Sequence, residues 1–366
     1  MSAASEHVGQ ATEMPVRLGP GDITCSRGLA TWLSTHQVSL ALSSYQTGQL
    51  FLVGVKPNGG IHFHAVGTNR AMGLWAEPQT LILATANQVI RFENILEENQ
   101  RVGDADKYYV PRVAHTTGDL DIHDIVKLKD SSIVFANTMY SCLSTLHPVH
   151  SFAPWWTPDF ISKLAAEDRC HLNGIALRGG KPAYVTMVSR ADVVNGWRDR
   201  RDLGGCIIDV RSNEVVTENL SMPHSPRWHQ GKLWVVNSGT GHLGWVDTAS
   251  GAFQEVCFLP GFARGLSFHN GHAIVGLSLP RDGSFKGLPL DDELKKRDAD
   301  PWCGVQIINL ATGDVVEWIR FSGVVKEMLD VCTLPGVRLP SAASPTSPEV
   351  SNLRTIASSS KHVEPA

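Results

Sequence analysis

Short apolar runs, broken by Gly, Asn, Ser and Asp, recur along most of this 366-residue chain. The runs lack the 3.6-residue spacing of amphipathic helices, so they predict short β-strands. Six units can be aligned, each headed by a small or polar residue followed by an apolar run. The heads are "SRGLATWL" at Ser26, "AMGLWA" at Ala71, "IHDIVKL" at Ile122, "LNGIAL" at Leu172, "PHSPRW" at Pro223 and "ARGLSF" at Ala263.

Each head is followed, after a turn signal, by a second apolar run such as "LILATAN" or "LWVVNSG". Third and fourth runs are clearest late in the chain, where "RSNE", "TASG" and "ATGD" predict hairpin turns. Units of four short strands at intervals of 40 to 51 residues are typical of β-propeller blades. We therefore predict an all-β fold, a single β-propeller over residues 21–336, with six blades favoured over seven.

The last segment and the two ends need separate interpretations. "VVKEMLDVCTLPG" from Val324 is either a strand that closes the ring or part of a seventh blade, because an open ring exposes strand edges. Residues 1–20 and 337–366 are rich in Ser, Pro, Ala and Thr. We predict that both are flexible tails.

The repeat predicts a site on the propeller axis. The first strand of every blade lines the central channel, and the residue at its start points into the funnel. These residues are Arg27, Met72, His123, Asn173, His224 and Arg264, with Glu327 added if the last segment keeps the same register. Packing alone would favour small or apolar residues at such a crowded place. Histidines, arginines and an amide there indicate a functional site.

Two heads resemble a known family. "NGIAL" at Asn173 and "HSPRW" at His224 resemble the "NGL" and "ESP-W" blade openings of the regucalcin/gluconolactonase group of six-bladed propellers. The resemblance implies a divalent metal bound at these openings and lactone hydrolysis. Asn173 matches an asparagine ligand, whereas His224 replaces a glutamate, which makes an oxygen-rich site nitrogen-rich. The whole chain is more similar still to a family of uncharacterised bacterial proteins with "HDIV", "NG-A", "PHSPRW" and "LPG-R-P" signatures, for which we expect the same propeller.

Three histidines near the axis are candidate metal ligands. His123, His171 and His224, helped by Asn173 or Glu327, could hold a divalent metal with an open position. Imidazole ligands suit zinc or iron better than calcium. The alternative is that these histidines only fill the channel and form hydrogen bonds there.

The same residues make sense without a metal. His123 and His224 could act as general acid and base, and Glu327 is the best candidate for a catalytic carboxylate. Arg27 and Arg264 could clamp a substrate carboxylate beside Asn173, or could simply pair with Asp119 or Asp121. Asp124 could orient a neighbouring imidazole or lie at the surface.

Two insertions are expected to overhang the funnel. They are "SRADVVNGWRDRRDLGG" in blade four and "SLPRDGSFKGLPLDDELKKRDADPW" in blade six. Long loops on a rigid scaffold commonly carry binding or gating. Trp155 and Trp156 in blade three would either form a third wall or pack between blades.

Composition limits the partners and the cellular location that we expect for this protein. The formal net charge is −4 and no basic stripe is visible, so nucleic acid is not an expected partner. No apolar leader or membrane-length segment stands out. Seven scattered cysteines without a CxxC motif predict reduced core thiols in a cytoplasmic protein.

These observations lead to one functional hypothesis and one rival. The hypothesis is an enzyme with an axial, metal-binding, histidine-rich site that acts on a small molecule or peptide bearing a carboxylate. Hydrolysis of a lactone type, lyase chemistry and isomerisation stay open. The rival is a non-catalytic interaction module that binds a partner at its rim.

Overall fold

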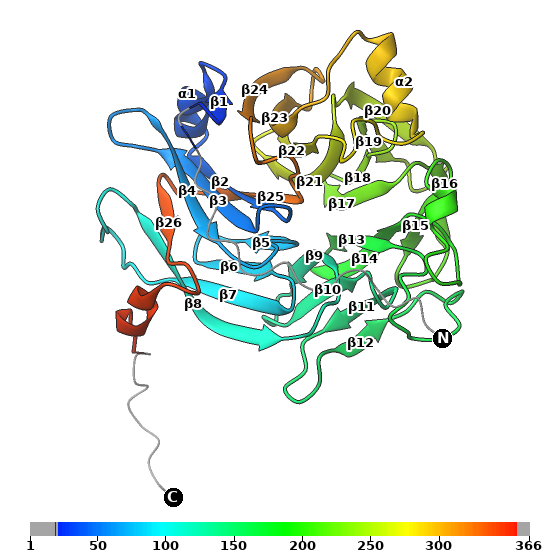
Figure 1. Cartoon of the computed structure of the whole chain (residues 1–366), viewed down its shortest axis with the longest axis horizontal. Helices are drawn as coiled ribbons and strands as arrows, with labels where there is room; N and C mark the ends of the chain where they lie inside the picture. The colour runs from blue at the N-terminus through cyan, green and yellow to red at the C-terminus, as the bar shows by residue number, and fades with distance from the viewer. Residues whose placement is uncertain (1–18, 20, 357–366) are drawn as a thin grey trace, which may run out of the picture.

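The chain folds into six β-sheets arranged like blades around a central axis (Figure 1). The structure is a computed structural model and describes residue 19 and residues 21–356. The innermost strands of neighbouring blades pack against one another all the way round. The prediction of a six-bladed all-β propeller is confirmed.

The blades are numbered in chain order, and their strands are given from the axis outward. Blade 1 contains β25 (Asp330–Pro335), β2 (Val38–Ser44), β3 (Gln49–Val55) and β4 (Ile61–Gly67). Blade 2 contains β5 (Leu74–Ala76), β6 (Thr80–Ala84), β7 (Gln88–Asn94), β8 (Lys107–Thr116) and β26 (Pro340–Ala342). Blade 3 contains β9 (Ile122–Lys127), β10 (Ile133–Asn137), β11 (Cys142–Thr145) and β12 (Ala153–Trp156).

The other three blades follow the same plan. Blade 4 contains β13 (Leu172–Arg178), β14 (Lys181–Met187), β15 (Gly205–Asp209) and β16 (Val215–Leu220). Blade 5 contains β17 (Pro223–His229), β18 (Lys232–Asn237), β19 (His242–Val246) and β20 (Phe253–Phe258). Blade 6 contains β21 (Phe262–His269), β22 (His272–Ser278), β23 (Cys303–Asn309), β24 (Val315–Phe321) and β1 (Ile23–Cys25). The helical elements are α1 (Leu29–Thr35), α2 (Pro289–Lys296) and the short η1 (Arg198–Arg200) and η2 (Pro348–Asn352).

Both ends of the ring are fastened at the junction of blades 6 and 1. Strand β25, late in the chain, pairs with β2 as the innermost strand of blade 1. Strand β1, early in the chain, pairs with β24 as the outermost strand of blade 6. The segment from Val324 therefore leads into a closing strand, and the alternative of a seventh blade is wrong.

The first predicted blade head is a helix instead of a strand. Leu29, Trp32 and Leu33 of α1 are buried, at the spacing of one helix face. Because β25 supplies the innermost strand of blade 1, the segment around Arg27 has no place at the axis. Arg27 is exposed in the turn before α1, so its predicted place in the ring is wrong.

Part of the segment predicted as a C-terminal tail is packed on the propeller. Strand β26 pairs in parallel with β8, at the outer edge of blade 2. Val337 and Leu339 are buried, and Asp106 accepts hydrogen bonds from the backbone N–H groups of Arg338 (2.9 Å) and Leu339 (2.8 Å). The predicted flexible tail is therefore wrong for these residues. Residues 1–18, 20 and 357–366 lie outside the described part of the chain.

Six residues occupy equivalent places at the starts of the innermost strands, and we call these the ring positions. They are Met72, His123, Asn173, His224, Arg264 and Leu329. Leu329 takes the place predicted for Arg27, and Glu327 lies two residues before it. The closing segment is therefore shifted by two residues from the predicted register.

The residue after each ring position fastens neighbouring blades together. Around the ring these residues are Gly73, Asp124, Gly174, Ser225, Gly265 and Asp330. Asp124 accepts a hydrogen bond from the backbone N–H of Ile175 in blade 4 (2.9 Å). Asp330 accepts one from Leu74 in blade 2 (3.0 Å). Asp124 thus neither orients an imidazole nor lies at the surface.

Glycines alternate with these oxygen-bearing side chains. Ser225 of blade 5 accepts a hydrogen bond from the backbone N–H of Gly265 in blade 6 (2.9 Å). A Cβ added at Gly265 would lie 2.5 Å from the backbone nitrogen of Val331, and one at Gly174 would lie 2.3 Å from Pro226 Cδ. Oxygen acceptors thus bind the next blade at three junctions, and glycines allow close approach at the other three. We call this alternation the inter-blade lock.

Arg227 lies between Asp124 and Asp330, two of the acceptors of the inter-blade lock. Its guanidinium donates to Asp124 Oδ2 (2.6 Å) and Oδ1 (3.3 Å) and lies 3.8 Å from Asp330 Oδ1. Both carboxylates are buried. Burial raises the pKa of Asp330 to about 7, with Arg227 opposing that rise.

The core lies between the blades. Every residue of β2 and β3 is buried, because each blade is covered on both faces. No disulfide joins any of the seven cysteines. Within the described residues, no helix is both long enough and apolar enough to cross a membrane.

Candidate axial site

The ring positions divide into an apolar and a polar half. Met72 and Leu329, in blades 2 and 1, are buried in one hydrophobic cluster. His123, Asn173, His224 and Arg264 occupy the ring positions of blades 3 to 6. The imidazoles of His123 and His224 lie 6.4 Å apart, centroid to centroid. The structure therefore brings the predicted polar residues together, with the exception of Arg27.

The backbone fixes which nitrogen of His224 carries a proton. Its Nδ1 lies 2.9 Å from the carbonyl oxygen of Met222 and 3.1 Å from Ser238 Oγ. A carbonyl only accepts, so Nδ1–H donates and Nε2 of the neutral ring carries a lone pair. This Nε2 atom is buried and has no hydrogen-bond partner among the described residues.

His123 and His171 are held in the same way. His123 Nδ1 lies 2.9 Å from the carbonyl oxygen of Asp121, and His171 Nδ1 lies 3.0 Å from Asp168 Oδ2. The two rings are 4.9 Å apart in an edge-to-face arrangement. Asp168 also accepts a hydrogen bond from Trp197 Nε1 (2.7 Å). All three imidazoles therefore use Nδ1 within the protein and leave Nε2 available.

Three consecutive ring positions contain buried polar atoms without a partner in the described chain. They are Asn173 Nδ2, His224 Nε2 and Arg264 Nε. Buried polar groups in proteins are nearly always hydrogen-bonded, because an unmade bond costs about 1–3 kcal/mol. Three such groups side by side indicate a place for a bound molecule or ordered water.

Arg264 is the most unusual of the three. Its side chain is 12% exposed, and its nearest acid is Glu327, whose Oε2 lies 3.7 Å from Arg264 Nη1. Glu327 instead accepts hydrogen bonds from Arg281 Nε (3.1 Å) and the Tyr45 hydroxyl (2.9 Å). Asp119, a predicted partner of the arginines, pairs with Arg70 instead.

Arg281 is a site residue that sequence reasoning missed. It belongs to the blade 6 insertion and its side chain is 61% exposed. Its guanidinium lies 5.3 Å from the centre of the Tyr45 ring. The only available signal was its place in an insertion expected to overhang the funnel.

Burial and charge set the protonation of the site. Burial lowers the pKa of His224 well below its ordinary value, and Arg264 and His123 lower it further. Burial also lowers the pKa of His123, against the opposing effect of Asp121. Desolvation raises the pKa of Asp121, but its interactions with neighbours, His123 first and the guanidinium groups of Arg70 and Arg264 among the others, outweigh this effect and lower the pKa. At neutral pH the lowered pKa values therefore favour neutral rings at His123 and His224, beside an ionised Asp121 and a cationic Arg264.

A pH experiment tests the state of His224. Acid should destabilise the protein through this residue, because the unfolded chain takes up a proton at the ordinary pKa and the folded chain does not. Between pH 7.5 and 5.5 this loss amounts to about 1.4 kcal/mol for one histidine of unfolded pKa about 6.5. In urea unfolding, His224→Gln should therefore lose about 1.4 kcal/mol less than wild type over this range. Equal losses would show that folded His224 binds a proton as readily as the unfolded chain.

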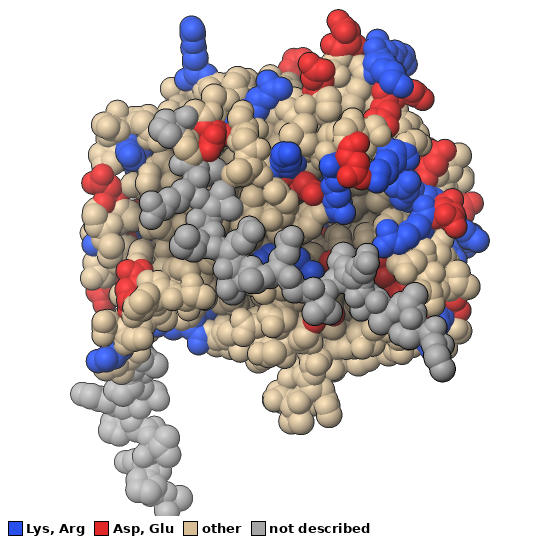
Figure 2. Space-filling view, in the orientation of Figure 1, with Lys and Arg blue, Asp and Glu red and all other residues tan. Residues whose placement is uncertain are grey.

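The two insertions lie over the histidines as predicted. Trp197 of the blade 4 insertion stacks on His171, with ring centres 4.2 Å apart. Phe285 of the blade 6 insertion stacks on Phe262, which itself contacts His224. The two insertions share one hydrophobic cluster. Around α2, acidic and basic side chains are interspersed on the face shown in Figure 2.

The predicted third wall is absent from the site. Trp155 and Trp156 lie in β12, the outermost strand of blade 3. Trp156 packs against the cluster shared by blades 3 and 4, whereas Trp155 is 43% exposed. Packing between blades is therefore the correct interpretation for Trp156.

Unusual backbone conformations mark the approach to the innermost strands. Arg70, Asp121, His171 and Met222 each lie two residues before a ring position and have φ between 45° and 58°. Non-glycine residues rarely adopt this conformation, and such strain is concentrated at functional sites. The turns before four blades are therefore strained, and two of them contain His171 and Asp121 next to the ring positions.

The structure supports the metal hypothesis in the hydrogen bonding of the histidines but not in their arrangement. Held Nδ1 atoms and available Nε2 atoms are typical of histidine ligands. However, within the described residues no three or more His, Cys, Asp or Glu side chains are arranged so that they could hold a metal ion. The geometry of His123, His171 and His224 thus does not fit the predicted metal centre.

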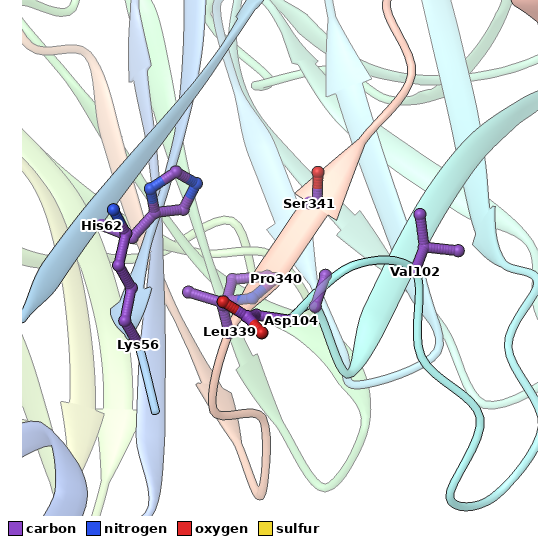
Figure 3. Close-up of a pocket in the computed structure, with 8 residues that line it drawn as sticks. Lys56, His62, Val102, Asp104, Leu339, Pro340 and Ser341 are labelled. Atoms are coloured by element: carbon purple, nitrogen blue, oxygen red, sulfur yellow. The ribbon is translucent and has the colours of Figure 1, made fainter. Parts of the chain in front are cut away.

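A separate cavity of about 210 Å³ lies near the outer end of blades 1 and 2 (Figure 3). Lys56 and His62 lie on one side of it and Val102 on the other, with Pro340 and Ser341 of β26 between them. It contains none of the predicted site residues.

Comparison with known proteins adds a family to this picture. Residues 27–343 match the family described as "Domain of unknown function (DUF4915)". The chain belongs to this family. The match includes every strand of the six blades except β1, and every residue of the axial cluster described above. No curated protein sequence matches the chain.

Three solved structures are similar to this DUF4915 chain to different degrees. A nidogen/laminin complex structure matches with a TM-score of 0.50 at 9% identity, covering 81% of this chain and 98% of that chain. A protein of unknown function from Bacteroides caccae matches with a TM-score of 0.48 at 10% identity, covering 81% and 98%. Virginiamycin B lyase from Staphylococcus aureus matches with a TM-score of 0.37 at 13% identity, covering 65% and 76%. At 9% identity the likeness to the nidogen/laminin complex structure concerns the fold alone.

Proposed function

We propose that this protein is a propeller enzyme that binds a small carboxylate-bearing molecule at the axial site and moves a proton on it. The supporting observation is the row of unpartnered buried groups at Asn173, His224 and Arg264. Asn173 and Arg264 offer donors, which suit carboxylate oxygens, and His224 offers an acceptor.

The chemistry follows from the neutral imidazole. His224 Nε2 takes a proton from an O–H or C–H group of the substrate, and the electron pair stays on the substrate. Arg264 faces the negative charge that develops, in a site with little water to screen it. His224 Nε2 then returns this proton to the product or to the leaving group, so the ring is neutral again for the next turnover. Lactone hydrolysis, elimination and isomerisation all include such a step.

No step of this proposal passes through a metal, because the donor set does not fit one as it is arranged. The resemblance to the regucalcin/gluconolactonase group motivates a metal measurement all the same. Elemental analysis of the purified protein and of His224→Gln reports whether zinc or iron accompanies the chain.

The experiment compares two histidines on one strand. His224 lies near the start of β17 and His229 at its end, where it stacks on Phe268. The variants are His224→Gln and His229→Gln. L-malate, citrate and glucono-δ-lactone serve as probes, with binding measured by calorimetry and conversion or deuterium exchange by NMR in D₂O. We expect His224→Gln to lower turnover about 100-fold or more and His229→Gln to leave it within about twofold of wild type. Failure of wild type to bind or convert any probe, or equal effects of the two variants, would refute the proposal.

The rival function, a rim interaction module, has one observation in its favour. Val193, Val194 and Leu203 of the blade 4 insertion are each at least 60% exposed. Exposed apolar groups can mark a protein contact. This rival predicts that His224→Gln leaves partner binding unchanged, so the same variant discriminates between the two functions.

A further inference from the structure

Glu327 lies between two arginines that have very different surroundings. Arg281 donates to both carboxylate oxygens of Glu327, at 3.1 Å each, whereas Arg264 lies 3.7 Å from the nearer one. The Tyr45 hydroxyl completes the contacts of the carboxylate. Glu327 itself is 8% exposed, so its charge needs the arginines around it.

Because Glu327 is hydrogen-bonded to Arg281, Arg264 has hydrogen-bond donors that are not used. Its Nε is buried without a partner, and its guanidinium rests on the face of Phe262, 4.8 Å from the ring centre. A buried guanidinium normally makes several hydrogen bonds, and a carboxylate can accept two of them at once. Glu327 balances the charge of Arg264 without occupying its donors.

The other arginine lies on an exposed segment of the blade 6 insertion. Arg281 lies in the exposed stretch before α2, where Gly283 and Gly287 adopt φ of 79° and 81°. Its side chain is mostly exposed, so its ion pair with Glu327 is weak compared with a buried one. If Arg281 moves to another carboxylate, Glu327 keeps the hydrogen bond from the Tyr45 hydroxyl and the charge of Arg264, 3.7 Å away.

We infer that Glu327 is an exchangeable counter-ion, which holds Arg264 and Arg281 until a substrate carboxylate displaces it. This inference rests on the proposed function. The incoming carboxylate takes the unused donors of Arg264, and Arg281 turns from Glu327 to close over it. Arg281 is thereby the second carboxylate-binding arginine of the site, the role that the sequence suggested for Arg27. Glu327 sets the affinity by competing for both guanidinium groups and is not a catalytic acid.

Substitution of Glu327 separates this role from the others. Glu327→Gln keeps the shape of the side chain and the bond from Tyr45, but it removes the competing charge. We expect it to bind malate and citrate about tenfold more tightly than wild type in calorimetry. Arg281→Gln should bind them about tenfold more weakly. The matched controls are Glu293→Gln and Arg297→Gln, which should change affinity less than twofold. Glu293 of α2 and Arg297, the residue that caps its C-terminal end, form an ion pair in the same insertion.

Each other outcome is informative. If wild type binds a probe and Glu327→Gln binds it equally or more weakly, Glu327 contacts the ligand or only supports the fold, and the inference is wrong. Unchanged affinity in Arg281→Gln would also overturn it, and this exposed position is not expected to affect folding. If no variant binds any probe, the proposed function itself fails. Urea unfolding of each variant reports whether the fold is retained.

Discussion

Replacing Arg227 with methionine should lower the free energy of unfolding by about 3–5 kcal/mol, the cost of removing one partner from a buried ion pair. The substitution keeps the apolar stem but leaves Asp124 and Asp330 without a positive charge between them. Burial already raises the pKa of Asp330, so the protein would have to take up a proton there or accept repulsion between two carboxylates. Denaturant unfolding monitored by tryptophan fluorescence measures the loss.

Arg178 provides the control for Arg227. It lies on β13 of the neighbouring blade, exposed, with its guanidinium 4.1 Å from the centre of the Trp228 ring. Arg178→Met should cost no more than about 1 kcal/mol, as expected for an exposed cation–π contact. Similar losses in the two variants would mean that the axial pair does not stabilise the ring.

Removal of residues 337–366 should lower the free energy of unfolding by roughly 5 kcal/mol, although the composition of this segment predicts a flexible tail. Val337 and Leu339 are buried, and burial of such side chains stabilises by about 1.5–3 kcal/mol each. Loss of β26 also leaves the edge of β8 unpaired and removes the hydrogen bonds to Asp106. The measurement is the thermal midpoint together with the denaturant midpoint.

A shorter truncation is the matched comparison. A chain ending at Ile356 keeps β26 and η2 and removes only residues outside the described part. It should unfold like the full chain. If both truncated chains have wild-type stability, the contacts of β26 contribute nothing measurable.

The blades could be predicted because their signal is local. Alternating and apolar runs, with turn residues between them, identify strands such as β13 and β17 without knowledge of their partners. The same local reasoning fails for Leu29–Thr35, whose head "SRGL" looks like that of "ARGL" in blade 6. Only the spacing of Leu29, Trp32 and Leu33 indicated a helix.

Long-range pairing explains the remaining differences. The segment around Leu339 forms a strand because β8 offers it a free edge, and no feature of "VRLPSAA" encodes that edge. Arg281 reaches Glu327 across 46 positions of the chain from inside an irregular loop. In contrast, His123, Asn173 and His224 were found together because a repeated fold brings equivalent positions to one axis.

The inter-blade lock is complete only in a ring with an even number of blades. Its smallest complete module is a pair of blades, one with an oxygen acceptor and one with a glycine, and three such modules close the circle. Insertion or loss of a single blade would place two acceptors or two glycines at one junction. Changes in the number of blades are therefore expected to come in twos, so that relatives built on this lock would have four or eight blades rather than five or seven.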